Sequence, residues 1–287
     1  MIFKIENEFI SAEINDLGAE LYSFKSKKSE TEYLWQGDPK IWSGRAPILF
    51  PIIGQLYRGK FNYNGKNFYL SKHGFARENL FTATVISTSS VVFSLISDEK
   101  TLLVYPFSFE LRVKFEMKGN ELIVTHSVVN ADNKTIYFSI GAHPGFNCKL
   151  GDFLEFEKEE TLLTERIDEN AIIMDEKFPL LEHSKSIEIT KDIFINDALF
   201  LTGYKSSCIK LRSPGHSREL RFNFGDAPFL GIWAKPAAPY VCIEPWFGTN
   251  DSYHPVKDIS QKRGIQRLGV NEIFSFTWSA EIYEPGC

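Results

Sequence analysis

The fold class is decided by the stretch Phe107-Ser-Phe-Glu-Leu-Arg-Val-Lys-Phe-Glu-Met117, which Lys118-Gly119-Asn120 joins to Glu121-Leu-Ile-Val-Thr-His-Ser-Val-Val129. Apolar and polar residues alternate through both runs, which is the period of a strand with one buried face. The Gly-Asn pair between the runs is typical of a tight hairpin turn. This stretch therefore predicts two long antiparallel strands.

The same alternation recurs along most of the chain. Ile273–Ile282 would place Phe274, Phe276, Trp278 and Ile282 on one face and Ser275, Thr277, Ser279 and Glu281 on the other. Helical periodicity is weak, and short helices are expected at most at Glu165–Met174 and Ile259–Leu268. Many short strands with regular turns predict an all-β fold, a large antiparallel β-sandwich. Because the sequence contains no internal repeat and no Pro/Ser-rich linker, we expect residues 1–287 to form one domain. Further strands are expected at Glu8–Asn15, Val91–Ile96, Thr135–Ile140, Leu199–Thr202, Cys208–Leu211, Glu219–Phe224 and Leu230–Trp233.

Composition narrows the possible partners. The net charge is -5 at pH 7, which argues against a nucleic-acid partner because phosphate binding needs a basic surface. No apolar run is long enough to span a bilayer, and the N-terminus lacks the order of a signal peptide. The four cysteines have no regular spacing and include no Cys-x-x-Cys pair, so we expect free thiols and a cytoplasmic protein.

Three separate segments carry residues suited to proton transfer: Lys72-His73-Gly74-Phe75-Ala76-Arg77, Gly141-Ala142-His143-Pro144-Gly145-Phe146 and Cys242-Ile243-Glu244-Pro245-Trp246-Phe247. Each combines Gly or Pro with an aromatic residue, a composition typical of a turn or strand end that lines a pocket.

His143 and Glu244 are the best candidates for an acid and a base. His143 lies among small residues that let a ligand approach, and its ordinary pKa is near neutrality. Glu244 ends an apolar segment, where an unpaired carboxylate is costly to bury and its pKa is easily changed. The alternatives are a turn histidine without a task and a structural ion pair.

Four other residues have weaker signals. If the segment from His73 to Arg77 is extended, both side chains share one face and could bind substrate, although a surface loop explains them too. Arg45, between Gly44 and Ala46-Pro47, could donate into a pocket or form a surface salt bridge. Asp197 follows an Asn, which is first of all a turn signal.

The remaining histidines and the tryptophans have simpler interpretations. His126 falls on the apolar face of its strand and is expected in the core, whereas His183, His216 and His254 lie in polar stretches. Trp35, Trp42, Trp233 and Trp246 cluster around the three segments. Such rings stack on the C–H faces of sugars, but packing in a core is their commoner use. Trp246 is the one we expect to contact substrate.

Taken in order, these segments resemble the aldose 1-epimerases (galactose mutarotase-like proteins), and especially the branch with the LacX-like proteins and the hexose-6-phosphate 1-epimerases. Gly44-Arg45-Ala-Pro-Ile-Leu-Phe-Pro51 and Gly231-Ile-Trp233-Ala-Lys-Pro236 match as well, so the similarity covers essentially the whole chain. The resemblance implies a galactose mutarotase-like supersandwich and a cofactor-free isomerase that interconverts the anomers of a hexose or hexose phosphate. It implies these roles: Glu244 as general base, His143 as general acid, His73 as a second site histidine, Asp197 as a ligand of sugar hydroxyls, and Arg45 and Arg77 as substrate-binding residues.

Two other functions fit the same residues. A His/His/Glu set could hold iron or zinc, although the closely spaced His-x-Asp/Glu pair common in such sites is absent. A non-catalytic carbohydrate-sensing protein could also use this fold, although the presence of both acid and base argues against it. Lys72, Arg77, Arg45 and Arg58 supply more positive charge than a neutral hexose needs, which favours tolerance of a phosphorylated sugar. The sequence does not identify the sugar or the oligomeric state.

Overall fold

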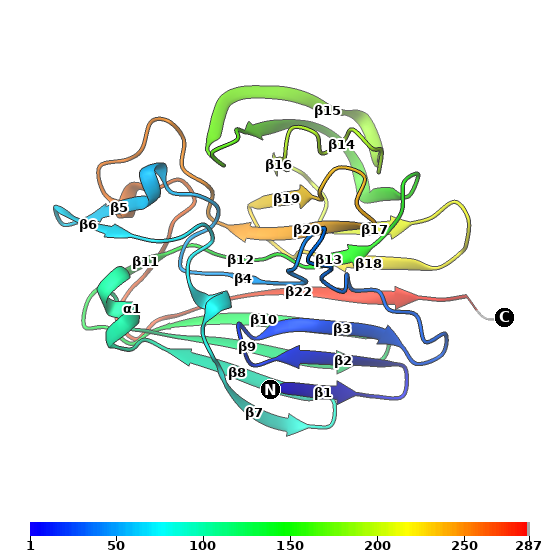
Figure 1. Cartoon of the computed structure of the whole chain (residues 1–287), viewed down its shortest axis with the longest axis horizontal. Coiled ribbons are helices and arrows are strands. Elements are labelled where there is room, and N and C mark those ends of the chain that lie inside the picture. Colours follow the sequence, from blue (N-terminus) through cyan, green and yellow to red (C-terminus); the bar gives the residue numbers. More distant parts are fainter. Residues whose placement is uncertain (286–287) are drawn as a thin grey trace.

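The computed structural model describes residues 1–285, and one continuous sheet of fifteen strands dominates it. The main path of this sheet runs β4-β12-β20-β19-β16-β14-β17-β18-β22-β10-β9-β8-β7, with β13 paired to β20 and β15 paired to β14. A three-stranded sheet, β1-β2-β3, lies over the β7–β10 end (Figure 1). The pairs β5-β6 and β11-β21 form two small separate sheets.

The strands of the first half are β1 (Ile2–Glu6), β2 (Ile10–Asn15), β3 (Glu20–Ser26), β4 (Ile48–Leu49), β5 (Lys60–Tyr63), β6 (Lys66–Tyr69), β7 (Thr82–Ser87), β8 (Ser90–Ile96), β9 (Phe109–Lys118), β10 (Glu121–Asn130), β11 (Ile136–Phe138) and β12 (Ile140–Ala142). Those of the second half are β13 (Gly145–Asn147), β14 (Phe153–Ile167), β15 (Ile173–Glu188), β16 (Leu199–Thr202), β17 (Cys208–Arg212), β18 (Glu219–Asn223), β19 (Phe229–Trp233), β20 (Tyr240–Phe247), β21 (Gln266–Leu268) and β22 (Ile273–Tyr283). The helical elements are η1 (Tyr57–Gly59), η2 (Ala76–Glu78), α1 (Glu99–Val104) and η3 (Ile259–Gln261).

The all-β prediction is confirmed, and the alternating pattern sets the register. β9 and β10 form the expected hairpin, with Met117 opposite Leu122 and Phe115 opposite Val124. β22 pairs with the other edge of β10. Its Phe276, Trp278 and Ile282 are buried, as the period of two requires.

The three-stranded sheet closes the β7–β10 end into a sandwich. Phe3 on β1 meets Phe93 on β8 edge to face, with ring centroids 5.4 Å apart. Residues of both sheets belong to one apolar cluster, which is rich in fully buried Phe side chains. This packing of two sheets face to face is the expected sandwich.

Both predicted helical regions were wrong in most of their length. Glu165–Ile167 ends β14, and Ile173 begins β15, so the first region is the turn of a long hairpin. Asp168 holds that turn, since its Oδ1 accepts from the N–H groups of Asn170 and Ile172. In the second region only Ile259–Gln261 is helical. Strand propensity and tertiary pairing outweigh the charged residues of β14 that look helical in sequence.

His126 is a core residue, as predicted. It is 1% exposed, its ring stacks on Phe276 at 4.6 Å, and its Nε2 accepts a hydrogen bond from the indole of Trp278 at 3.0 Å. Within residues 1–285, no helix is long and apolar enough to cross a membrane.

Candidate active site

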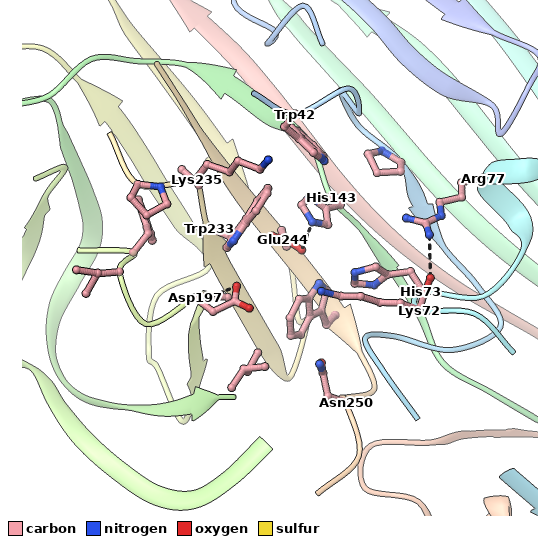
Figure 2. A pocket seen from close by; sticks show the side chains of 18 residues that line it. Trp42, Lys72, His73, Arg77, His143, Asp197, Trp233, Lys235, Glu244 and Asn250 are labelled. Atoms are coloured by element: carbon pink, nitrogen blue, oxygen red, sulfur yellow. Dashed lines mark hydrogen bonds and ion pairs between the residues drawn. The ribbon is translucent and has the colours of Figure 1, made fainter. Parts of the chain in front are cut away.

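The three predicted segments meet at one cavity of about 520 Å³ that is open to solvent (Figure 2). It lies in the half of the large sheet that contains β12, β19 and β20, which are labelled in Figure 1. His73, His143 and Glu244 all line it. Residues from the loop before β16 and the one after β19 form its opposite side in Figure 2. The antiparallel pairing of β12 and β13 with β20 brings two of the three segments together.

Strand β20 supplies the floor of the cavity. Alternation along a strand puts Tyr240, Cys242, Glu244 and Trp246 on one face. Glu244 is 1% exposed and Trp246 is 3% exposed. Gly231 of β19 lies directly opposite Glu244, and a Cβ at this position would come within 2.6 Å of the Trp246 ring. A glycine is therefore required for the indole to lie flat beside the carboxylate.

His143 lies in the turn between β12 and β13, and its Nε2 is 3.3 Å from Oε2 of Glu244 (Figure 2). The Pro144 carbonyl accepts from the N–H of Ile243, which fixes the turn on β20. The two groups that sequence reasoning selected as acid and base are thus in contact.

Burial pushes the pKa values of this pair in opposite directions. Desolvation lowers the pKa of His143 to about 3 and raises the pKa of Glu244 well above its usual range. Both shifts favour the uncharged form of each group. In that form the carboxyl of Glu244 carries a proton beside a neutral imidazole, and this proton can move between the two groups without a change in total charge.

His73 is held in one tautomer. Its Nδ1 accepts the N–H of Gly54 at 3.0 Å, so the ring proton of the neutral imidazole is on Nε2. Desolvation also lowers the pKa of His73 well below its usual value. Since His73 lines the cavity, its Nε2–H can donate a hydrogen bond there but the ring does not readily take up a second proton.

The segment from His73 to Arg77 is not extended, although the side chains of both residues reach the cavity. His73 and Gly74 have φ of 68° and 71°, and Arg77 falls in the 3-10 turn η2. A Cβ at Gly74 would lie 2.3 Å from the Phe50 carbonyl oxygen. This tight approach, rather than a strand period, directs both side chains inward.

The rings of Trp42 and Trp233 form an aromatic wall beside His143. The Trp42 ring lies 5.1 Å from that of His143 and meets Trp233 edge to face at 5.5 Å. Cβ atoms at Gly44 or Gly145 would come within 2.9 Å of the Trp42 ring. Both glycines therefore leave the space that this indole needs beside the imidazole.

Asp197, Trp246 and Asn250 add polar groups to the cavity wall. Asp197 is also the turn residue that its sequence predicted, with φ of 68° and its Oδ1 accepting from the N–H of Ala198. Among the described residues, the Trp246 Nε1 and the Asn250 Oδ1 have no well-formed hydrogen bond. The indole N–H is still close enough to favour the charged carboxylate of Glu244.

Three cationic side chains line the cavity: Lys72, Arg77 and Lys235. Arg77 donates from Nη2 to the Lys72 carbonyl at 3.0 Å, and its Nε is 3.7 Å from Glu78. Lys72 approaches the proton pair, since its charge lowers the pKa of Glu244 against the larger effect of desolvation.

Arg45 and Arg58 are not among the described residues that line the cavity. The Arg45 guanidinium donates to the Tyr22 carbonyl at 2.6 Å and lies over the Tyr22 ring. Arg58 lies over Tyr57 in the η1 turn. Neither position supports the contacts with substrate that the sequence suggested. The loop directions that turn both side chains away cannot be read from composition.

The His/His/Glu metal set, considered above as an alternative, differs from the arrangement observed. The potential metal ligands that come together are His143, Cys242 and Glu244, whose donor atoms all lie within 4.8 Å of one another. His73 is outside this group, and its Nδ1 is already occupied. Sequence reasoning also missed Asn250 and Lys235 as cavity residues. Lys235 could have been found from its place in the quoted segment after Trp233, whereas Asn250 had no recognisable signal.

Comparison with known proteins shows which family this chain is similar to. The family described as aldose 1-epimerase matches residues 1–264. The chromosomal LacX protein of Lactococcus lactis subsp. lactis is 35% identical over 284 residues, which cover 93% of this chain and 95% of LacX. The crystal structure of a galactose mutarotase related enzyme from Lactobacillus acidophilus superposes with a TM-score of 0.94 and 33% identity, over 99% of this chain and 98% of that one.

A second crystal structure, of a galactose mutarotase-like protein from Lactobacillus casei, has a TM-score of 0.94 and 28% identity, over 99% of this chain and all of that one (100%). The all-β fold is therefore the galactose mutarotase-like sandwich. The sequence and the fold agree, and the chain belongs to the aldose 1-epimerase family.

Proposed function

We propose that this protein is an aldose 1-epimerase that interconverts the α and β anomers of a hexose by acid–base ring opening. The observation that carries the proposal is the contact between His143 and Glu244, 3.3 Å apart on the floor of the cavity. A pair that holds a single proton can donate to one oxygen of a sugar and accept from another.

The reaction needs two coupled proton transfers. With the proton on His143, the Glu244 carboxylate removes the proton from the C1 hydroxyl while the imidazolium protonates the ring oxygen. The ring opens to an aldehyde, rotation about C1–C2 exposes its other face, and the reverse transfers close the ring as the other anomer. Each transfer is worth roughly two to four orders of magnitude in rate. The pair is regenerated, so the steps use only these side chains.

The other cavity residues supply binding and orientation. His73 donates from Nε2 to a sugar oxygen, and the Asp197 carboxylate offers acceptors for hydroxyl groups. The Trp42 and Trp233 rings face the C–H surface of the sugar, and Trp246 lies beside the reacting carbon. Holding the ring in this way reduces the entropy cost of alignment with the pair.

A 6-phosphorylated hexose is the finer substrate assignment that we propose. Lys72, Arg77 and Lys235 line the cavity, so three cationic groups face two carboxyl groups, those of Asp197 and Glu244. Because burial favours the neutral form of Glu244, the cavity as a whole favours an anion. Arg77 can bind phosphate through two parallel hydrogen bonds.

The test is a screen of free and 6-phosphorylated aldoses for accelerated anomer exchange, measured by exchange NMR on pre-equilibrated sugar. We expect at least one sugar to exchange faster with the protein than without it, and the Glu244→Gln variant to remove that acceleration. If a sugar binds but the protein accelerates anomer exchange for none of the sugars tested, the result would instead support a carbohydrate-sensing protein.

A further inference from the structure

We propose that His143, Cys242 and Glu244 also form a binding site for a thiophilic divalent cation such as Zn²⁺ or Cd²⁺, and that the bound ion blocks the cavity. The inference goes beyond the proposed function, because the site is defined by the positions of three donor atoms and its occupancy can be measured without any sugar. Cys242 has no role in the proton transfers described above.

The distances suit a tetrahedral ion. Two ligands at about 2.0 Å from Zn²⁺ are separated by about 3.3 Å when the angle between them is tetrahedral. The Nε2 of His143 and the Oε2 of Glu244 are 3.3 Å apart. The Cys242 sulfur lies within 4.8 Å of both. A thiolate and an imidazole or carboxylate on one tetrahedral Zn²⁺ are roughly 3.5 Å apart, so the three side chains move closer together when the ion binds.

The donor types also suit such an ion. Imidazole, thiolate and carboxylate together favour zinc or cadmium over magnesium or calcium, which bind oxygen ligands. Cys242 and Glu244 are two residues apart on β20 and share a face of the strand, and Gly145, two residues after His143, lies opposite Cys242. The central sheet therefore fixes all three backbone positions.

The ion would enter from the cavity, because His143 and Glu244 line it and Cys242 lies behind them, fully buried. A fourth ligand position would face the cavity and could hold a water molecule or a sugar oxygen. The Nδ1 of His143 has no hydrogen-bond partner within residues 1–285. In most metal sites the second ring nitrogen of a histidine ligand donates to an orienting partner, and this hydrogen bond strengthens metal binding. Because His143 lacks such a partner among the described residues, the site suits a reversible inhibitor better than a permanently bound ion.

Binding must release protons. The ligands that bind M²⁺ are a thiolate, a carboxylate and a neutral imidazole, so any proton held on these groups leaves when the ion binds, and the ion with these three ligands has no net charge. The affinity therefore rises with pH. The ion and the sugar compete, because both need His143 and Glu244.

Co²⁺ and Zn²⁺ are the probes. We expect the metal-free protein to bind one Co²⁺ with a thiolate-to-cobalt charge-transfer absorption in the near ultraviolet, and Zn²⁺ to displace it in equilibrium dialysis. Cys242→Ala should abolish the absorption and weaken Zn²⁺ binding by at least about tenfold. Cys148→Ala is the matched control, since Cys148 is outside the ligand set, and it should bind as the parent does.

Inhibition is measured separately, as anomer exchange with and without Zn²⁺, each variant being compared with its own metal-free rate. We expect Zn²⁺ to inhibit the parent and the Cys148→Ala variant competitively with sugar, and to inhibit Cys242→Ala at least about tenfold less strongly. Equal Zn²⁺ affinity of Cys242→Ala and the parent, or cobalt spectra without thiolate absorption, would overturn the site. Ordinary Zn²⁺ binding in a protein that exchanges no sugar would contradict the proposed function and leave the metal site intact.

Discussion

His126 and His143 are both buried histidines whose pKa desolvation lowers to about 3, yet their surroundings differ in one decisive respect. His126 accepts from Trp278 and stacks on Phe276 inside the sandwich. His143 contacts a buried carboxylate and opens onto a cavity. Burial and a perturbed pKa are thus shared by a structural and a candidate catalytic residue.

The difference lies in where a proton can go. At His126 the neighbouring groups are an indole donor and an aromatic ring, so a second ring proton has no compensating charge. At His143 the partner is Glu244, and the proton that burial removes from the imidazole can remain on that carboxyl. Perturbed pKa values indicate function only when a partner group and access to a ligand accompany them.

The largest expected effect comes from replacing either member of the His143–Glu244 pair. Glu244→Gln and His143→Asn should each lower the exchange rate by roughly 10²–10⁴-fold, because each removes one proton transfer and changes the shape little. The rate is measured by exchange NMR at saturating sugar. His126→Asn is the matched core variant, and its folded fraction should exchange sugar at close to the parental rate. A rate within threefold of the parent for either cavity variant would end the assignment.

His73 tests a histidine that lies between these two cases, because it lines the cavity but holds a fixed tautomer. In His73→Asn the amide oxygen can replace Nδ1 as the acceptor for Gly54, and Asn tolerates positive φ, but the Nε2–H donor is lost. We expect kcat/KM to fall about ten- to hundredfold, as for one hydrogen bond to a charged or polarised group.

His73→Gln is the matched comparison for that donor, because its longer side chain can bring an amide N–H to the position of Nε2. It should retain more activity than His73→Asn. If both variants lose the same amount, the ring acts through packing and its hydrogen bond is unimportant.

The core histidine also contributes to the pH dependence of stability. The pKa of His126 is lower in the folded state than the ordinary 6.5, so the unfolded chain binds the proton more tightly. Stability from this group is therefore complete above pH 6.5 and is lost as the pH falls toward the folded-state value. Below pH 6, one such group contributes a slope of about 1.4 kcal/mol per pH unit.

Urea unfolding of the parent and of His126→Leu between pH 4 and pH 8 measures this slope. The variant loses some stability at every pH because the Trp278 N–H is left without its acceptor. The informative quantity is the pH dependence, which should be shallower in the variant by about the slope of one group. Parallel curves would show that His126 is protonated in the folded protein.

The same contrast explains how much the sequence predicts. The strict alternation in β9, β10 and β22 predicts their pairing and places His126 in the core, because a strand's period determines its faces. His73, His143 and Glu244 are recognisable from their small and aromatic neighbours. The positions of Arg45 and of Asn250 are not, because loop side chains follow φ values and close contacts, such as that of Gly54 with Asn250, that leave no periodic pattern. The long β14–β15 hairpin is missed because its charged residues obscure the alternation.

A smaller effect concerns the charge around the cavity pair. Arg77→Ala should raise KM for a hexose 6-phosphate about tenfold, the value of one charge-assisted hydrogen bond, and the increase should shrink at high salt. KM for the unphosphorylated hexose should change little. Arg58→Ala, outside the cavity, is the control. Equal effects of Arg77→Ala on both sugars at both salt concentrations would show that the substrate is neutral.

The smallest expected effect is that of a chelator. The proposed proton transfers use only Glu244 and His143, so dialysis against EDTA should not lower the exchange rate. Any trace of Zn²⁺ bound at His143, Cys242 and Glu244 would inhibit, and its removal could only raise the rate. The measurement is the exchange rate of one preparation before dialysis, after it, and after Zn²⁺ or Mg²⁺ is added back. A rate lost on chelation and restored by one divalent ion would instead identify the contact between His143 and Glu244 as part of a catalytic metal site. The comparison with His126 would then separate a metal ligand from a core residue.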